Sequence, residues 1–525
     1  MVAIVSLVKN GYFPRELPPP FTTDPLGNLV SAKLSSFPEE FDGSSGPNFR
    51  SRAAVHNLTR VGSLRRKLSI PNPVNYILLS KRISADWLAM YAHCLTSTYS
   101  LSRPNLTNIF GRAVGREQPL TAIPDFRARL RATSRYVLKT DISLFYPTIY
   151  THSIPWALNG KATAKAAIGS PALIGNEIDR FVRDGQEGQT MGIPIGPDTS
   201  LVIAESVLTA ADRDFQAATD ANGFRYMDDY EFGFSNYADA EHALAVLQGV
   251  LNNYELQLNP NKTQIVAMPE PIESLWVSEL RVFPFRSGPK DQRYDLTWYF
   301  NRAFELSKLN RTDYVLKYAL SRLASESIDA ANWEFYQHLL LQTVLAEPGT
   351  LPFALDELKH YVDLGFPLDS LATSAVLSEI ISVNSPLGHG SDVAWALWGS
   401  ILLNLPIESG AVNRVAEVAD PVVALLALDA NSNGLIGTGF SSTLWEGLMT
   451  TAELRGDQWL LSYEANVKGW LPGVGGVDNL VGEPAFQFLK SEGVHFYDQS
   501  LTASYKPRRT RLGDDVSGAA AVSHV

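Results

Sequence analysis

Cysteine is almost absent from this sequence, with Cys94 as its one representative in 525 residues. A single thiol excludes an intramolecular disulfide framework and a cysteine-based zinc site, and it fits a reducing compartment. Long apolar runs are also lacking, which excludes a membrane-spanning helix. The first residues have neither the basic start nor the cleavage site of a signal peptide. We therefore expect a cytoplasmic protein that makes no membrane contact.

Positive charge is scarce overall and unevenly placed. The formal net charge is −11, which argues against a protein that coats nucleic acid indiscriminately. Residues 50–139, however, hold 16 Lys and Arg against 3 acids, whereas residues 331–525 hold 9 Lys and Arg against 22 acids. We expect the first third of the chain to build a basic channel that attracts phosphates, which the last third cannot do.

Breaks in composition divide the chain into four parts, and its length suggests two or three domains. Residues 1–50 are rich in Pro, Gly and Ser and predict an irregular arm, partly ordered by aromatic side chains. Residues 51–280 carry mixed patterns, with helices expected in pieces up to about residue 135. Residues 281–500 show apolar helical patterns between breakers at roughly 35–45 residue intervals, which suits an all-α, HEAT-like helical repeat domain. Residues 501–525 predict a flexible tail.

The central feature of the sequence is the run 224–234, in which two aromatic-rich segments flank Asp228 and Asp229. The aromatic residues alternate with a period of two on both sides of the acids, which predicts a β-hairpin with the carboxylates at its tip. Met-Asp-Asp has no glycine and is poor turn chemistry, so we infer that something other than folding placed the acids there. On their own, the paired acids suit a divalent-metal site and an ordinary acidic loop equally well.

A third acid, Asp141, ends a predicted strand well before the hairpin. The order of strand, helices, hairpin, helix and strand predicts an α+β fold with a small antiparallel sheet covered by helices on one face. Strand ends can lie side by side in such a sheet, so we expect Asp141, Asp228 and Asp229 to hold two Mg²⁺ or Mn²⁺ ions. One ion would activate an attacking hydroxyl, and the other would steady a triphosphate and the leaving pyrophosphate.

Four segments together resemble the reverse transcriptases. Residues 226–229 read YMDD and match the YxDD signature of that family, and residues 141–146 read DISLFY, similar to its first catalytic segment. Residues 194–196 (PIG) stand where the family has a Pro-Gln-Gly loop, and residues 258–263 (LNPNKT) resemble its later lysine-bearing segment. The resemblance covers roughly residues 60–280. It implies the fingers and palm of an RNA-directed DNA polymerase-type nucleotidyltransferase that uses dNTPs.

The resemblance also implies metal-binding and sugar-binding roles for single residues. Asp141 and Asp228 would be the principal metal ligands, assisted by Asp229 and by the backbone carbonyl of Ile142. Tyr146 would stack beneath the incoming sugar and reject a 2′-hydroxyl, although a plain core aromatic residue is the alternative.

Further roles concern the nucleotide. Lys262 would protonate the leaving pyrophosphate, although a solvated turn lysine is an equal alternative. Ile195 and Gly196 would lie near the nucleotide, and we name Arg129 and Arg131 from their position as triphosphate contacts.

Two departures from the family indicate how the site is used. Ile195 replaces a glutamine that lies near the templating base pair in the family, and an acidic helical domain replaces the basic thumb that would grip a duplex. Both departures fit the abortive-infection (AbiK-like, prophage-type) reverse transcriptases of bacteria. That group implies untemplated, protein-primed DNA synthesis, homo-oligomers and antiviral defence against phage. Tyr12 is our priming hypothesis, with an aromatic anchor of the arm as the alternative.

The sequence therefore predicts a reverse-transcriptase-class DNA polymerase whose single-stranded DNA product is covalently attached to the protein. One alternative is a template-directed RNA-dependent DNA polymerase of a retron-like or group II intron-like system. An alternative of another class is a catalytically idle scaffold that acts through the helical domain. Neither the primer, the product sequence, the trigger nor the size of the oligomer follows from the sequence.

Overall fold

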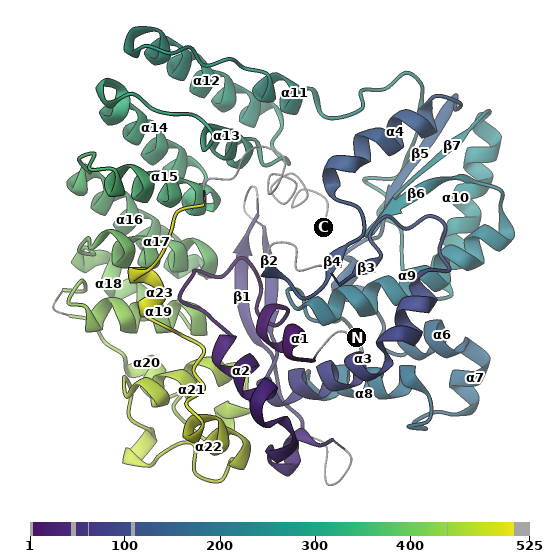
Figure 1. Ribbon diagram of the computed structural model, residues 1–525, viewed down its shortest axis with the longest axis horizontal. Coiled ribbons are helices and arrows are strands. Elements are labelled where there is room, and N and C mark those ends of the chain that lie inside the picture. The colour runs from purple at the N-terminus through teal and green to yellow at the C-terminus, as the bar shows by residue number, and fades with distance from the viewer. Residues whose placement is uncertain are drawn as a thin grey trace.

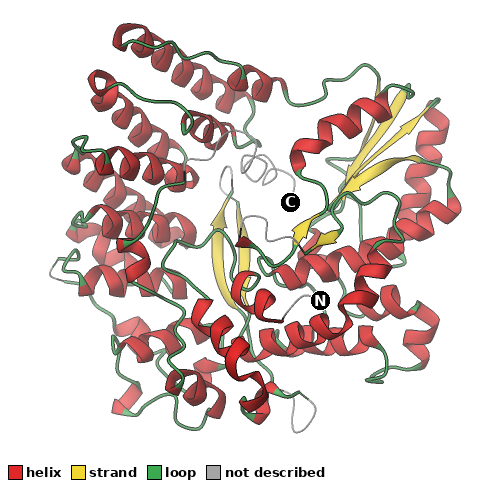
Figure 2. Ribbon diagram, in the orientation of Figure 1, coloured by secondary structure: helices red, strands yellow, loops and turns green. Residues whose placement is uncertain are grey.

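The computed structural model describes residues 4–43, 49–60, 62, 64–106, 111–437 and 439–508. A sheet-bearing half stands opposite a column of helices, with strands β1 and β2 and the first helices between them (Figure 1). Helices dominate, and the strands form three small sheets (Figure 2). Residues 44–48 of the expected arm and residues 509–525 of the expected tail lie outside the described residues. Within the described ranges, no helix is long and apolar enough to cross a membrane.

The four-stranded sheet is antiparallel, as the sequence predicted. Its strands in spatial order are β6 (Asn222–Tyr226), β7 (Asp229–Phe234), β5 (Tyr136–Asp141) and β8 (Gln264–Ala267).

Helices of the first half connect and cover the strands. They are α1 (Ile4–Asn10), α2 (Asp24–Lys33), α3 (Pro73–Cys94), α4 (Ile123–Arg131), α5 (Phe145–Thr148), α6 (Ser153–Asn159), α7 (Lys161–Ala166), α8 (Ile174–Asp184), α9 (Asp198–Ala218) and α10 (Tyr237–Asn252), with the two-residue strands β3 (Pro104–Asn105) and β4 (Gly115–Arg116).

Alternation along β7 gives the sheet two different faces. The Phe232 ring packs against Phe215 of α9, with 4.9 Å between ring centroids, and against Tyr99 at 5.1 Å. Glu231 and Gly233 point to the other side, because successive strand residues face opposite ways. Helix α4 lies on that second side, where a Cβ on Gly233 would come within 2.9 Å of Leu130. Helices therefore cover the apolar face and, through α4, part of the other.

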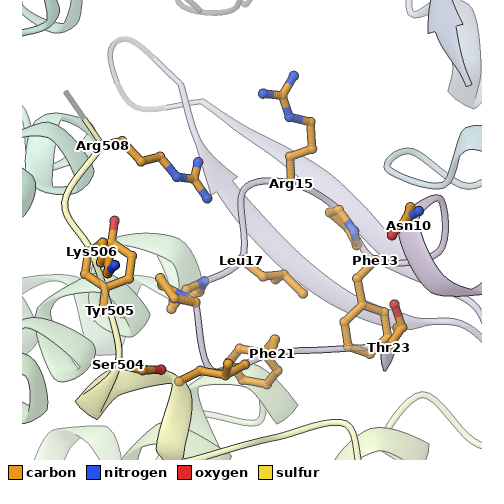
Figure 3. Close-up of a pocket in the computed structure, with 14 residues that line it drawn as sticks. Asn10, Phe13, Arg15, Leu17, Phe21, Thr23, Ser504, Tyr505, Lys506 and Arg508 are labelled. Atoms are coloured by element: carbon orange, nitrogen blue, oxygen red, sulfur yellow. The ribbon is translucent and has the colours of Figure 1, made fainter. Parts of the chain in front are cut away.

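The N-terminal segment, residues 4–43, differs from the irregular arm that the sequence indicated. It contains α1 and α2, and Tyr12 stacks on Tyr76 of α3 with ring centroids 4.1 Å apart. Phe21 packs against Tyr497 at 5.1 Å. A cavity of about 410 Å³ lies between this segment and residues 501–508, with Arg15 and Arg508 reaching it from the two ends of the described chain (Figure 3). Aromatic burial outweighs the Pro and Gly content, so the segment is a packed connection between both halves.

A β-hairpin stands where we expected helical pieces. β1 (Ala54–Thr59) pairs antiparallel with β2 (Arg65–Ile70). The consecutive cations at 65–67 hide the alternation of β2 from a pattern search. The expected helix at 75–93 is present as α3.

After β8, the described residues form helices and no further strand. Successive helices pack on one another, including α12 on α13, α16 on α17, α17 on α19 and α19 on α21. This helical half consists of α11 (Leu275–Arg281), α12 (Pro289–Leu309), α13 (Val315–Leu323), α14 (Trp333–Ala346), α15 (Leu351–Asp363), α16 (Ser370–Asn384), α17 (Gly390–Leu403), α18 (Ser409–Val415), α19 (Pro421–Ser432), α20 (Thr443–Glu446), α21 (Trp459–Lys468), α22 (Pro484–Ser491) and α23 (Ser500–Ala503).

Candidate active site

The three predicted acids meet at one end of the four-stranded sheet. Asp141 is the last residue of β5 and lies directly opposite Asp229, the first residue of β7. Asp228 precedes Asp229 in the turn from β6 to β7. Asp141 and Asp228 are each only 3% exposed. The fold therefore buries two carboxylates side by side, which needs a compensating positive charge.

Part of that compensation comes from Lys262. Its Nζ donates a hydrogen bond to Asp141 Oδ2 at 2.6 Å. Asp141 Oδ1 and Asp228 Oδ1 are buried, and neither oxygen has a hydrogen-bond partner among the described residues. Buried polar atoms nearly always have partners, so these two oxygens are the strongest sign that the acids serve a ligand.

The electrostatics of the acids agree with this interpretation. Burial raises the pKa of Asp228 to about 7, and the negative charge of Asp141 adds to the rise. Burial and then the charge of Asp228 raise the pKa of Asp229 well above its usual value. Each acid would become easier to ionise if a cation approached, because opposite charge favours the ionised form.

Two of the three predicted acids, and not all three, are arranged to bind a metal ion together. Among the residues that the structure describes, no three His, Cys, Asp or Glu side chains stand close enough together to hold an ion. Asp229 instead lines a cavity of about 280 Å³ beneath α4, together with Lys262 and Tyr226. The free oxygens of Asp141 and Asp228 fit one hard cation, which prefers carboxylate oxygens. The other carboxylate oxygen of Asp141, Oδ2, accepts the hydrogen bond from Lys262 in this structure.

Backbone strain occurs beside both buried acids. Met227 has φ of 56° and Leu144 has φ of 46°, a left-handed conformation that costs a non-glycine residue about 1–2 kcal/mol. The Met227 N–H donates to Ser102 Oγ at 2.9 Å, and Arg225 Nη1 donates to the Met227 carbonyl at 2.8 Å. These two hydrogen bonds stabilise the turn at Met-Asp-Asp, whose residues do not favour a turn by themselves.

Arg225 belongs to a buried ionic network that the sequence did not reveal. It is fully buried and forms ion pairs with Glu205 and Asp212 of α9, both at 2.7 Å. Burial alone would raise the pKa of Glu205, but Arg225 and the hydroxyls of Ser100 and Ser102 bring it below its usual value. A single arginine in a strand pattern does not reveal this role in the sequence. Through the bond from Arg225 to the Met227 carbonyl, the network supports the turn that carries Asp228.

Tyr146 lies beside the acids, in α5. Its side chain is 8% exposed, and burial raises its pKa, so the hydroxyl is neutral. Its backbone carbonyl accepts a hydrogen bond from Ile193 N–H at 3.0 Å, which ties α5 to the loop before Ile195. Ile142 follows Asp141 and is 1% exposed. The structure thus places Ile142 directly after β5 and Tyr146 in α5. Their metal-binding and sugar-binding roles stay predictions.

The loop of Ile195 and Gly196 joins three parts of the chain. Ser69 N–H of β2 donates to the Ile195 carbonyl at 2.9 Å. Gly196 has φ of 128°, and a Cβ there would lie 2.6 Å from Pro14 Cγ. Only glycine fits this conformation and this close approach. The loop therefore contacts both the β1–β2 hairpin and the N-terminal segment.

Arg129 and Arg131, which we predicted to contact the triphosphate, have other partners in the structure. Arg131 is nearly buried and is committed to Glu231 at 3.2 Å and to the Pro271 carbonyl at 2.7 Å. Arg129 is exposed, with its guanidinium over the Phe126 ring at 5.9 Å. The prediction of Arg131 as a triphosphate contact is therefore wrong in this conformation, because Glu231 neutralises it.

Arg66 of β2 is a cation that our sequence argument missed. Burial, and then the charge of Arg60, lower its pKa, while Asp228 is among the acids that act in the opposite sense. Arg116 also faces the site, with its guanidinium 5.6 Å from the centroid of the Tyr226 ring. The run of cations at 65–67 was the available signal.

Tyr12 does not fit a priming role. Its side chain is 0% exposed, and its hydroxyl donates to the Pro71 carbonyl at 2.5 Å. A primer hydroxyl must reach the catalytic acids, and this one is fixed in the core. The structure contradicts this prediction and supports the alternative, an aromatic anchor.

Comparison with known proteins gives the site a family context. Residues 100–285 match the family model described as "Reverse transcriptase (RNA-dependent DNA polymerase)". The curated proteins gave no match.

Two solved structures are similar to parts of the chain. One is apo telomerase from Candida tropicalis, truncated from its C-terminal domain, with 16% identity, 46% of this chain and 54% of that chain covered, and a TM-score of 0.30. The other is telomerase from Candida albicans in complex with a TWJ fragment of telomeric RNA, with 12% identity, 71% and 69% covered, and a TM-score of 0.27. This chain thus spans about half the length of the first structure.

Proposed function

We propose that the chain, through its reverse transcriptase domain at residues 100–285, is a DNA polymerase that adds dNMPs to a hydroxyl primer. One observation carries the proposal. Asp141, at a strand end, and Asp228, in a strained turn, each keep a buried carboxylate oxygen that no described residue hydrogen-bonds, and both lie within that domain. Bound divalent ions would supply the charge that activates the primer hydroxyl and steadies the leaving pyrophosphate.

The residues around the acids have distinct tasks in this proposal. Asp141, Asp228 and the carbonyl of Ile142 would hold the cations, with Asp229 assisting. Lys262 would leave Asp141 when a cation binds and donate a proton to the pyrophosphate, because its ammonium is already at the site.

The nucleotide would be selected by neighbouring side chains. Tyr146 would lie beneath the sugar and exclude a 2′-hydroxyl, which makes dNTPs the substrates. Arg66 and Arg116 would contact the triphosphate, since both cations lie within electrostatic reach of Asp228.

We further propose that synthesis is untemplated and protein-primed, in the manner of the abortive-infection (AbiK-like) group with its HEAT-like repeat domain. Ile195 supports this, because it gives no polar side chain to a templating base. Helix α4 covers part of the sheet face that carries Asp229 and Glu231, which limits the room for a duplex. The acidic helical half also disfavours a grip on phosphates.

The biological setting is part of the same proposal. The product would be single-stranded DNA attached to the protein, made by a cytoplasmic homo-oligomer in defence against phage. With Tyr12 buried, the priming hydroxyl belongs to another residue.

Incubation of the purified protein with the four dNTPs and Mg²⁺ tests the proposal. We expect DNA that migrates with the protein on a denaturing gel until protease releases it, and whose sequence does not depend on added RNA. Faithful copies of the added RNA would instead support the second candidate, a template-directed RNA-dependent DNA polymerase, which the description of the matched family favours. Absence of any incorporation would contradict both and would favour the idle scaffold.

A further inference from the structure

The β1–β2 hairpin lies between the two halves of the molecule, with helix α17 packed against β1 (Figure 1). A polymerase that closes its fingers on a nucleotide needs this hairpin at a defined distance from the catalytic acids. The contacts that hold it come largely from the helical half, which the polymerase chemistry described above leaves without a task.

Asp392, in the first turn of α17, is the main attachment point. It is 1% exposed, and its Oδ2 accepts a hydrogen bond from Arg65 Nη2 at 2.9 Å. Its Oδ1 accepts from the hydroxyl of Thr59. His389 also contacts the Arg65 guanidinium, at 2.8 Å. One buried carboxylate therefore holds the last residue of β1 and the first residue of β2, at the turn end of the hairpin.

A second acid holds the other side of β1. His56 is fully buried, with Nδ1 2.9 Å from Asp420 Oδ2. The Asp420 Oδ1 atom meanwhile accepts from Val422 N–H and caps α19. A Cβ on Gly390 would lie 2.1 Å from Asp420 Oδ2. The backbone at the start of α17 thus lies directly on this pair, which makes the docking close and specific.

The attachment on one face of β2 has a consequence on the other face. Arg65 and Arg66 are consecutive strand residues, so their side chains point to opposite faces. Arg65 is bound to the helical half, and Arg66 lies within electrostatic reach of Asp228. Among the residues that the structure describes, Arg66 forms no ion pair with an acid. Its nearness to Arg60 favours an anion as its partner.

We propose that Asp392 is a positioning residue for nucleotide binding, which holds the β1–β2 hairpin through Arg65 and Thr59 so that Arg66 meets the triphosphate of the dNTP. The inference rests on the proposed function and extends it: the helical half fixes the fingers, in addition to any role of its own. Asp392 touches neither substrate nor the catalytic acids. Its effect passes through the hairpin.

The test is Asp392→Asn in the full chain, which keeps the side-chain shape and removes the charge that holds Arg65. We expect the KM for dNTP to rise about tenfold while kcat stays within about twofold, the pattern of lost substrate binding without lost chemistry. Amide hydrogen exchange of residues 54–70 should accelerate. In an Arg66→Ala background the same substitution should raise KM by less than about twofold, because the group that it positions is gone.

A matched control removes a similar pair elsewhere in the helical half. Asp295, in α12, is paired with Arg286. Helix α12 stands apart from β1 and β2 in Figure 1. Asp295→Asn should leave KM and the exchange of residues 54–70 unchanged. If Asp392→Asn does not fold, Thr59→Val, which removes one donor to Asp392, is measured in its place, with an expected rise in KM of about threefold.

The outcomes separate this inference from the proposed function. An unchanged KM, or a fall in kcat alone, would overturn the positioning role. If the wild-type chain incorporates no dNMP, the proposed function fails. Hydrogen exchange then decides the inference by itself: unchanged exchange of the hairpin in Asp392→Asn would contradict it.

Discussion

Lys262 and Asp141 show how single residues prepare the site. The ammonium of Lys262 lies 2.6 Å from Asp141 Oδ2, which partly neutralises two buried acids. A cation that binds both acids competes with this lysine. The lysine side chain is 41% exposed, so it can withdraw into solvent when a metal ion arrives.

Replacement of Lys262 by Met should therefore strengthen metal binding. An ion pair of this exposure is worth up to about 1 kcal/mol, so we expect the affinity for Mn²⁺ without nucleotide to rise by up to about fivefold. Electron paramagnetic resonance of free Mn²⁺ measures it. Lys161→Met, at a lysine that donates to the Asn253 carbonyl, is the control. Weaker Mn²⁺ binding in Lys262→Met would contradict the competition.

Tyr12 gives a second residue-scale prediction. Tyr12→Phe removes the hydroxyl that donates to the Pro71 carbonyl. A buried carbonyl left without its donor costs about 1–3 kcal/mol, so the free energy of unfolding in urea should fall by that amount. DNA attached to the protein should form as before. Loss of the attachment with unchanged stability would restore Tyr12 as the primer.

Among single residues, the sequence predicted the three acids of the site but not the arginines that lie around them. Asp141, Asp228 and Asp229 were predictable because their spacing matches a signature. Arg225 and Arg66 were not, because an arginine takes its role from partners that only the fold brings near. Arg131 and Tyr12 were wrong for the same reason, since Glu231 and Pro71 are distant in the sequence.

Strand β6 and helix α9 act as one element through Arg225. The arginine is enclosed between Glu205 and Asp212 and also supports the strained turn at Met227. An intact buried ionic network contributes little net free energy to folding. Removal of one member is strongly destabilising, because the remaining charges stay buried without a partner.

Arg225→Met should therefore destabilise the protein by about 3–5 kcal/mol. Chemical denaturation followed by tryptophan fluorescence measures the change. Arg213→Met, at an exposed arginine of α9, should change stability by less than about 0.5 kcal/mol. A loss as small as that of the control would show that the network is dispensable.

Helix α21 carries a buried acid with its own pH dependence. Burial raises the pKa of Glu464 to about 7, although its Oε2 accepts from Phe496 N–H at 2.7 Å. A raised pKa in the folded state means that the contribution of Glu464 to stability is complete below about pH 4 and is lost as pH rises to about 7.

Glu464→Gln should remove that loss. At pH 8 the variant should be more stable than the wild type by about 3 kcal/mol, and the difference should shrink towards pH 5. Urea denaturation across this range measures it, with Glu241→Gln on the exposed side of α10 as the control. A difference that does not vary with pH would refute the role of burial.

Elements were predictable where their patterns are regular. The alternating aromatics of β6 and β7 and the spacing of α3 predicted those elements well. The β1–β2 hairpin was missed because three cations interrupt the pattern of β2, and because β1 packs against α17, which is distant in the sequence. The packing of residues 4–43 was missed because it comes from contacts with Phe496 and Tyr497.

In the whole molecule, two packed connections join the part that matches the reverse transcriptase model to the helical half. The N-terminal segment packs on both, and the β1–β2 hairpin is held by Asp392 and Asp420. Both connections come close to the four-stranded sheet. The N-terminal segment does so where Pro14 meets Gly196, and the β1–β2 hairpin does so where Arg66 comes within electrostatic reach of Asp228. The helical half is therefore placed to affect the site through these two connections.

The central claim is that the buried acids of this molecule catalyse DNA synthesis, and incorporation of labelled dNMP by Asp228→Asn tests it most directly. Loss of a cation ligand removes several kcal/mol of transition-state stabilisation, so we expect incorporation to fall about a thousandfold or more. Asp220→Asn, at an exposed acid just before β6, should keep the wild-type rate and Tm. Asp228→Asn removes a buried charge, so its Tm should be no lower than that of the wild type. Incorporation by Asp228→Asn within about tenfold of the wild type would contradict the account.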